Sequence, residues 1–252
     1  RNLAKIKTTH HGAPAKAMVL VDRSTPREPR VFERGNSNNK GEKVPRQFLG
    51  FLEAQERKPY TDGSGRLEMA RSIASDTNPL TARVWVNRVW GHLMGSHLVS
   101  TPSDFGLRSA LPSHPKLLDY LAFNFIKDGW STKKLIRSIL ISSTYKQSSI
   151  GLKEAETQQI DPENRMFTRA NRKRLDFESF RDSILYVSGK LDTTMYGRPV
   201  DIASSNYSTR RSIYARIERQ NLPPVFRTFD FASPDIHSPK LPETTVPQQA
   251  LF

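Results

Sequence analysis

From residue 64 onward, apolar residues recur every three or four positions, which is the period of an amphipathic helix. The first such stripe consists of Leu67, Ala70, Ile73 and Ala74. The clearest helix start follows, because Asn78 is a favoured N-cap residue and Pro79 then occupies the first helical position. We expect Gly95 to end this second helix, since glycine readily adopts the left-handed conformation that closes a helix.

Two more helices are predicted in the middle of the chain. Ser113 is the expected cap of one, and Gly129 is its expected end. Its apolar stripe consists of Leu117, Leu118, Leu121, Phe125 and Ile126. Ser131 is the expected cap of the other helix. Its stripe consists of Leu135, Ile136, Ile139 and Leu140.

A further helix is predicted between Asp176, as its cap, and Gly189, as its end. The stripe that we expect to be buried consists of Phe177, Phe180, Ile184 and Val187. Residues 244–252 combine a threonine cap, a proline and apolar residues, which indicates a helix that begins where the sequence stops. We therefore expect the domain to be truncated at its C-terminus.

Strand patterns are few. Residues 17–22 and 30–34 are short apolar runs that are predicted to pair as a hairpin, and residues 35–41 have the composition of a loop. Residues 213–217 alternate apolar and polar side chains, which favours a strand. The predicted fold is mainly α with a small β component, with an irregular N-terminal region (1–60) followed by a helical domain (61–252).

Composition excludes several kinds of chemistry. The chain has no cysteine, so it has no disulfide, thiolate nucleophile or Cys-ligated metal. His92 and His97 are five residues apart and flank Gly95, so they do not share a helix face as paired zinc ligands would. We therefore predict no metal site and no cofactor in this segment. No apolar run reaches the length of roughly 20 residues that a membrane helix needs.

The net charge of +14 is unevenly distributed. Residues 1–60 hold 13 Lys and Arg against 6 Asp and Glu, and residues 165–227 again hold 13 against 6. Residues 61–164, with 12 against 10, are nearly neutral. Arg outnumbers Lys, 24 to 15, and the guanidinium group pairs well with carboxylates, phosphates and sulfates. The pattern fits either internal ion pairs or a polyanionic partner.

The candidate anion-binding residues are Arg172, Arg174, Arg210, Arg211, Arg216 and Arg219. Arg174, Glu178 and Arg181 are also spaced as helix-surface neighbours. The same charges therefore fit an ion-pair network that fastens this helix to the segment at 210–211. Both interpretations stay open.

Catalytic motifs are absent. The chain has no Gly-x-Ser-x-Gly elbow, no phosphate-binding loop and no Gly-x-Gly-x-x-Gly. Asp104, Asp230 and Asp235 lie in turn-rich segments where acids for glycoside hydrolysis occur, but turns and caps use the same residue type.

A series of segments does carry a resemblance. They are Ser64–Glu68, Asn78–Trp90, Leu98–Gly106, Pro112–Leu121, Gly129–Leu135, Ser143–Tyr145, Asp161–Arg165, Arg172–Leu175, Phe229–Phe231 and Thr244–Leu251. In this order they resemble the planctomycete family called domain of unknown function fifteen-fifty-three, over nearly the whole chain. Where that family usually has a glycine, this chain has His97, so a family-wide role for His97 is not expected.

The resemblance implies context rather than chemistry. It implies the C-terminal part of a large exported protein, outside the cytoplasm, whose upstream segments carry any c-type haem. The leading hypothesis is a non-catalytic structural or interaction module whose basic faces dock an acidic protein or an anionic polysaccharide, alongside the upstream domains of the same polypeptide. One alternative is an enzyme acting on acidic or sulfated carbohydrate. Nucleic-acid binding is a second alternative, which conflicts with export.

Overall fold

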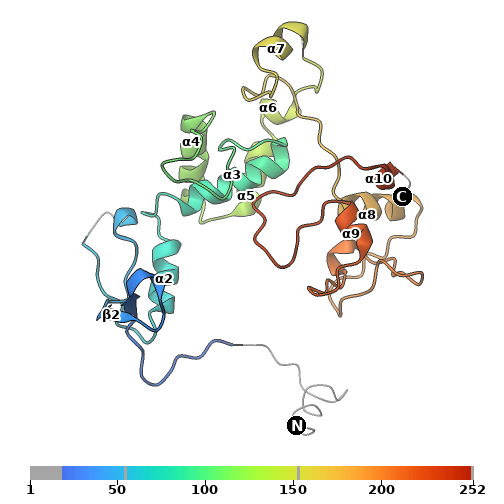
Figure 1. Cartoon of the computed structure of the whole chain (residues 1–252). Coiled ribbons are helices and arrows are strands. Elements are labelled where there is room, and N and C mark those ends of the chain that lie inside the picture. Colours follow the sequence, from blue (N-terminus) through green and yellow to red (C-terminus); the bar gives the residue numbers. More distant parts are fainter. Residues whose placement is uncertain (1–18, 54–55, 152–153, 251–252) are drawn as a thin grey trace, which may run out of the picture. The chain divides into compact units, whose positions relative to one another are not determined.

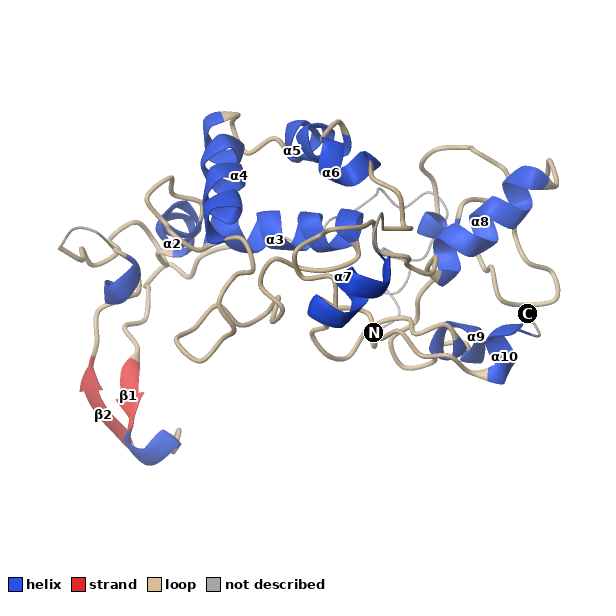
Figure 2. Ribbon diagram, turned by 90° about the horizontal axis from the view of Figure 1, so that it is seen from above, coloured by secondary structure: helices blue, strands red, loops and turns tan. Residues whose placement is uncertain are grey.

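The structure is a computed structural model that describes residues 19–53, 56–151 and 154–250 (Figure 1). In these residues helices predominate and a two-stranded sheet is the only β-sheet (Figure 2). The predicted fold class, mainly α with a small β component, is confirmed. The chain divides into two compact units, Arg1–Thr81 and Ala82–Phe252.

The sheet of the first unit is a short antiparallel hairpin. Strand β1 (Arg30–Phe32) pairs with β2 (Lys40–Lys43), and the 3-10 turn η1 (Glu33–Gly35) begins the connection between them. Residues 36–39 form the predicted loop, whereas the prediction is wrong for Gly35, which lies in η1, and for residues 40 and 41, which lie in β2. The turn reverses the chain because Arg34 and Gly35 both adopt left-handed backbone conformations, with φ angles of 50° and 75°.

Residues 19–22, which were expected to form the second edge of the hairpin, form no strand, and residues 17 and 18 lie outside the described residues. Asp22 instead accepts hydrogen bonds from the backbone N–H and the Oγ of Ser64, both at 2.7 Å. It also pairs with Arg66, the first residue of α2 (Arg66–Ile73). This side-chain anchoring replaces the predicted strand pairing. A further 3-10 turn, η2, covers Gly50–Leu52.

The start of α3 (Thr81–Met94) confirms the predicted cap. The Oδ1 of Asn78 accepts hydrogen bonds from the backbone N–H groups of Leu80 (3.0 Å) and Thr81 (3.4 Å). At the other end Gly95 has a φ of +76°, as the left-handed end of a helix requires.

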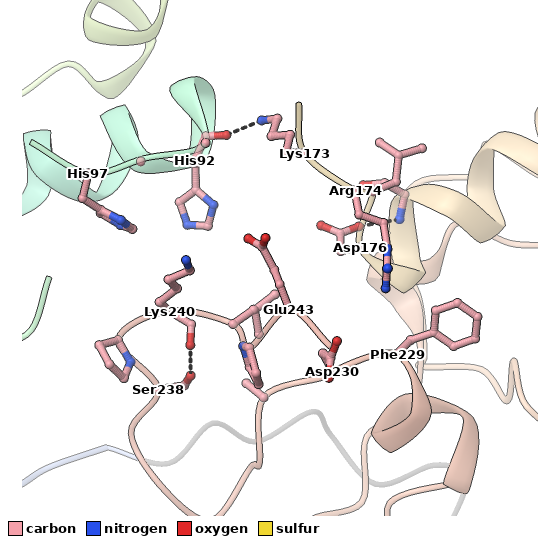
Figure 3. Close-up of a pocket in the computed structure, with 18 of the residues that line it drawn as sticks. His92, His97, Lys173, Arg174, Asp176, Phe229, Asp230, Ser238, Lys240 and Glu243 are labelled. Carbon is pink, nitrogen blue, oxygen red and sulfur yellow. Dashed lines mark hydrogen bonds between the residues drawn. The ribbon is translucent and has the colours of Figure 1, made fainter. Parts of the chain in front are cut away.

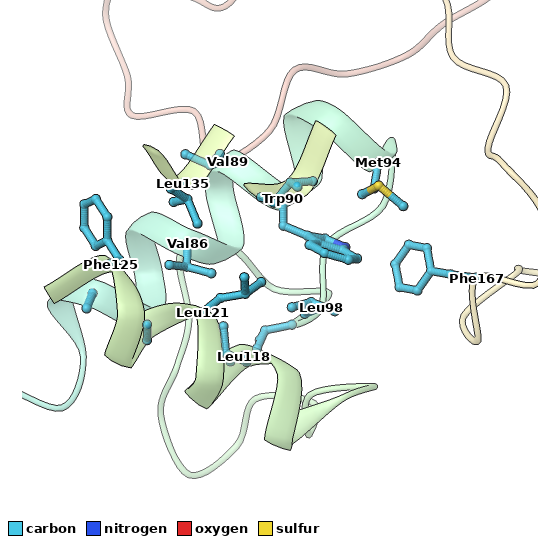
Figure 4. Close-up of a cluster of buried hydrophobic side chains, with 14 residues drawn as sticks. Val86, Val89, Trp90, Met94, Leu98, Leu118, Leu121, Phe125, Leu135 and Phe167 are labelled. Carbon is cyan, nitrogen blue, oxygen red and sulfur yellow. The ribbon is translucent and has the colours of Figure 1, made fainter. Parts of the chain in front are cut away.

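The first core of the second unit forms around α3, α4 (Pro115–Lys127) and α5 (Thr132–Leu140), and the short helix α6 (Ser143–Lys146) follows (Figure 4). Its buried members include Val86, Trp90, Leu98, Leu118, Leu121, Phe125, Leu135, Ile139 and Phe167. The ring of Trp90 meets that of Phe167 edge-on, with centroids 5.4 Å apart. Asn87 is fully buried and exchanges two hydrogen bonds with the backbone of Val99, at 2.9 and 3.1 Å. This pair fixes the chain after α3 against the helix.

The predicted N-cap residue is confirmed for α5 and wrong for α4. Ser131 is confirmed as the cap of α5, since its side chain accepts from the N–H of Lys134. The expectation that Ser113 caps α4 is wrong: the N-cap residue is His114, without a side-chain capping bond. The hydroxyl of Ser113 instead lies 3.0 Å from the Nδ1 of its neighbour His114, which removes it from the helix terminus.

Beyond α7 (Glu154–Ile160), helix α8 (Phe177–Val187) buries a face that matches the predicted one only at its start, where Phe177 is buried and Phe180 partly buried. Its buried residues are Phe177, Arg181 and Leu185. Ile184 is 48% exposed and Val187 is 85% exposed, so the prediction that they are buried is wrong. The face of α8 that carries Arg181 is the one turned inward, because its guanidinium forms hydrogen bonds there that an apolar side chain cannot form. The cap at Asp176 is confirmed by a 2.7 Å bond from the N–H of Ser179.

A second core consists of Phe177, Ile202, Leu222 and Phe226, to which α9 (Pro224–Thr228) contributes. The predicted strand at 213–217 is wrong. The chain there forms a 3-10 turn, η3 (Ser212–Tyr214), and makes an isolated bridge between Val200 and Ala215. The last helix is α10 (Pro247–Ala250). In the described part of the chain no helix is long and apolar enough to cross a membrane.

Candidate functional site

The arginines that the sequence singles out lie at several places in the second unit. The guanidinium of Arg174 donates to the carbonyl of Thr244 and to Oε1 of Gln249, both at 2.6 Å, and to Oγ1 of Thr245 at 3.0 Å. It therefore fastens the C-terminal segment. Arg172 is exposed and makes no hydrogen bond or ion pair within the described residues.

Arg210 is committed to the loop that precedes it. Its guanidinium donates to the carbonyls of Thr194 and Arg198, both at 3.1 Å, and to that of Tyr196. The same group lies 4.0 Å from the ring centroid of Tyr214, a cation–π contact. Arg210 thus organises the loop rather than a ligand site.

The remaining three arginines follow along the same segment. Arg216 pairs with Glu218 at 3.3 Å, and Arg219 pairs with Asp235. Arg211 is exposed and lines another pocket, which includes residues of α8. Since Arg174 and Arg211 line different pockets, the structure does not gather the six arginines into one site. Their anion-binding role stays a prediction.

Arg181, one of the residues expected in the ion-pair network between α8 and the segment at 210–211, links the two through hydrogen bonds. Arg181, only 7% exposed, donates to the carbonyl of Arg210 (3.1 Å), to that of Ser208, and to Oγ of Ser212 (3.2 Å). The adjacent Asp182 accepts from the N–H and Oγ of Ser212, at 2.8 and 2.7 Å. Burial lowers the pKa of Arg181, and Asp182 acts in the opposite direction.

The sequence predicts a link between this helix and the segment at 210–211, but it places Arg181 on the helix surface, whereas the structure buries it. Within the described residues, Glu178 makes no ion pair with Arg174 or Arg181. The signal was nevertheless present: Phe177, Arg181 and Leu185 are spaced four residues apart and share one helix face.

One pocket of the second unit, of about 350 Å³, is lined by many charged side chains (Figure 3). Three parts of the chain line it: the end of α3 with the turn after it, residues 173–179 at the start of α8, and residues 229–249. Arg174 belongs to this lining and is one of the six candidate anion-binding arginines. The apolar part of its wall includes Leu175, Phe229 and Leu241.

Several charged groups of this pocket already have structural partners. Lys173 donates to the carbonyls of His92 and Leu93, which neutralises the exposed carbonyl end of α3. Asp176 caps α8, as described above. Asp230 accepts from the N–H and Oγ1 of Thr244, both at 2.7 Å. These groups shape the pocket but are not available to a ligand.

Four basic side chains of the pocket have no such partner. Arg88, His92, His97 and Lys240, here called the basic cluster, form no side-chain hydrogen bond or ion pair within the described residues. Figure 3 shows the two imidazoles and the Lys240 ammonium converging on one another. Burial, and then the positive charges of Lys240, His92 and Arg88, lower the pKa of His97.

The position of His97 depends on a glycine. A Cβ added at Gly91 would lie 2.3 Å from Nε2 of His97, far inside van der Waals contact. Gly91 is buried in α3, one helical turn before Gly95. Because Gly91 has no side chain, there is room for the imidazole of His97 to lie against α3.

One acid faces the basic cluster. Glu243 is exposed, lines the pocket and points toward its centre from the C-terminal segment (Figure 3). It makes no ion pair within the described residues. The pocket thus combines free cations with one free carboxylate.

The other acids that the sequence offered as candidates have local roles. Asp104 accepts from the N–H of Gly106 at 2.8 Å, and Asp235 pairs with Arg219. With Asp230 bonded to Thr244, all three act within turns and connections. In the described residues, no group of three His, Asp or Glu side chains is placed to hold a metal ion.

Of three comparisons with known proteins, one gives a match. No curated protein and no solved structure matches the chain. Residues 65–252 match the family described as PSD1: Protein of unknown function (DUF1553). Because this match covers about three quarters of the sequence, and agrees with the resemblance carried by its motifs, the chain belongs to that family.

Proposed function

We propose that this chain is a non-catalytic interaction module that docks an anionic partner, an acidic protein or an anionic polysaccharide, through the basic cluster. One observation carries the proposal: four basic side chains line one pocket, and none of them has a side-chain hydrogen bond or ion pair in the described part of the chain. Like charges held together repel one another, and a bound anion removes that cost.

The wider setting is also part of the proposal. The motif resemblance implies that the module belongs to a large exported protein with cytochrome-like upstream segments, and that its partner lies outside the cytoplasm. Nucleic acid is the less favoured polyanion, because it conflicts with that location and because the chain has no recognised nucleic-acid reader.

The test is binding of the fragment to dextran sulfate, to polyglutamate and to duplex DNA across a salt series. The double variant Arg88→Gln/Lys240→Gln should weaken binding and reduce the slope of log affinity against log salt concentration by about two, one for each charge removed. Arg165→Gln/Lys190→Gln is the matched control, since it removes two exposed charges outside the pocket. Equal binding by both variants would rule out docking through the pocket, provided both melt like the wild type.

A second candidate, an enzyme acting on acidic or sulfated carbohydrate, is favoured by one feature. Glu243 and Arg88 line the same pocket, and neither side chain forms an ion pair with any residue that the structure describes. A carboxylate in such a place is able to act as a general acid or base. Turnover of a sulfated oligosaccharide that disappears in Glu243→Gln would establish the enzyme, and unchanged turnover would remove Glu243 from the chemistry.

A further inference from the structure

The basic cluster draws its members from three directions. Arg88 and His92 come from α3, His97 from the turn after it, and Lys240 from the C-terminal segment. Only Arg88 carries a guanidinium, the group that offers two hydrogen-bond donors in one plane. The site therefore offers hydrogen-bond donors from several side chains around one space, and not only the two coplanar donors of a single guanidinium.

A ligand suited to such a site has acceptor atoms pointing in several directions. A carboxylate presents two oxygens in one plane and matches a single guanidinium fork. A sulfate or phosphate monoester presents three oxygens in a tetrahedral arrangement, so donors on different sides are used together. Resting on the proposed function, we infer that the basic cluster binds the tetrahedral oxyanion of a sulfated or phosphorylated sugar unit.

The surroundings of the cluster fit a sugar ester better than a free inorganic ion. Glu243 faces the same space and is an acceptor that repels an isolated anion. The hydroxyl groups next to an ester on a sugar ring supply the donors that this carboxylate lacks. Leu175, Leu241 and Pro242 add apolar wall for the face of the ring. At about 350 Å³ the pocket has the size of a small-ligand site.

Binding is expected to be linked to proton uptake. Burial, and then the positive groups of Lys240, His92 and Arg88, lower the pKa of His97 and so disfavour its protonated form. A bound dianion or monoanion favours the protonated imidazole, which is an additional charged donor. The remaining charged groups that line the pocket are Lys173, Arg174, Asp176, Asp230 and Glu243, and all but Glu243 are held by structural hydrogen bonds.

The proton-linked part of the inference depends on His97, whose pKa is lowered by burial and by the neighbouring positive charges. Arg88, His92 and Lys240 would hold the oxyanion without it. Loss of His97 should therefore weaken ester binding at pH 5.5 and reduce its pH dependence, since the protonated imidazole is one of the donors.

The experiment compares four hexoses that differ at one position: glucose 6-sulfate, glucose 6-phosphate, glucuronate and glucose. Binding to the whole fragment is measured at pH 5.5 and pH 8 by histidine NMR shifts and titration calorimetry. We expect at least one ester to bind about tenfold more tightly than glucuronate at pH 5.5, a difference of about 1.4 kcal/mol, and glucose not to bind. The ester that binds more tightly identifies sulfate or phosphate as the natural group.

Glucose 6-sulfate, which does not titrate in this range, tests the proton linkage. Its affinity should fall by about tenfold between pH 5.5 and pH 8, the size of one charge-assisted hydrogen bond. His97→Gln should flatten this dependence, whereas His237→Gln, an exposed histidine outside the pocket, should preserve it. Binding of glucuronate as tight as that of both esters, or no binding of any derivative, would overturn the inference.

These outcomes separate the inference from the proposed function. If dextran sulfate or polyglutamate binding depends on Arg88 and Lys240 but the esters show no advantage, only the tetrahedral specificity is wrong. If polyanion binding ignores Arg88 and Lys240, the proposed function itself is wrong.

Discussion

The substitution Gly91→Ala separates the stability of the protein from the geometry of its pocket. The new Cβ would lie 2.3 Å from Nε2 and 2.4 Å from Cδ2 of His97, where ordinary contact begins near 3.4 Å. The imidazole must therefore move by about 1 Å or more. The three atoms nearest to the new Cβ all belong to this side chain, so the displacement falls on His97 rather than on backbone.

Two effects on stability oppose each other. Alanine in a helix interior is more stable than glycine by about 1 kcal/mol, which favours the variant. Forcing His97 out of its rotamer costs about 0.5–1.5 kcal/mol. We expect the free energy of unfolding of Gly91→Ala to stay within about 1 kcal/mol of the wild type, while sugar-ester binding falls about tenfold because one donor has left the site.

The assay is urea denaturation together with a double-mutant cycle. In the His97→Ala background the steric conflict is absent, so Gly91→Ala should stabilise by about 1 kcal/mol. The pKa of His97 in Gly91→Ala, followed by NMR, should move back up toward its ordinary value as the imidazole leaves the half-buried seat. The reasoning fails if Gly91→Ala stabilises the wild type and the His97→Ala background equally.

Three further predictions concern the rest of the second unit. Arg181→Met should destabilise by about 3 kcal/mol in urea denaturation, because it removes a buried guanidinium and leaves backbone carbonyls unpaired, whereas the exposed Arg172→Met should cost less than about 0.5 kcal/mol; similar losses in both would contradict the buried network. Asn87→Ala should cost about 2 kcal/mol and raise hydrogen exchange at the amide of Val99, whose acceptor is lost; unchanged exchange would refute this bond. Since the pKa of folded His97 is lowered, its unfolded state binds more protons, so stability is fully present above about pH 6.5 and declines as the pH falls below it. His97→Gln should reduce that decline, and an unchanged pH profile would argue against a buried neutral imidazole.

The sequence by itself determined most helix limits in this protein. Asn78, Ser131 and Asp176 cap their helices as predicted, and Gly95 and Gly129 follow helices with positive φ. These features depend on hydrogen bonds and backbone preferences within a few residues, which a linear pattern contains. The sequence motifs also identified the family.

Only the tertiary structure decided which helix face is buried and which charges are free. The apolar stripe of α8 suggested Ile184 and Val187, but the buried position belongs to Arg181, whose partners lie about thirty residues away. Likewise Arg88 and Lys240 share a pocket although 152 residues separate them in sequence. Burial and pairing depend on what another part of the chain places opposite a side chain, and charge counting along the sequence does not contain that information.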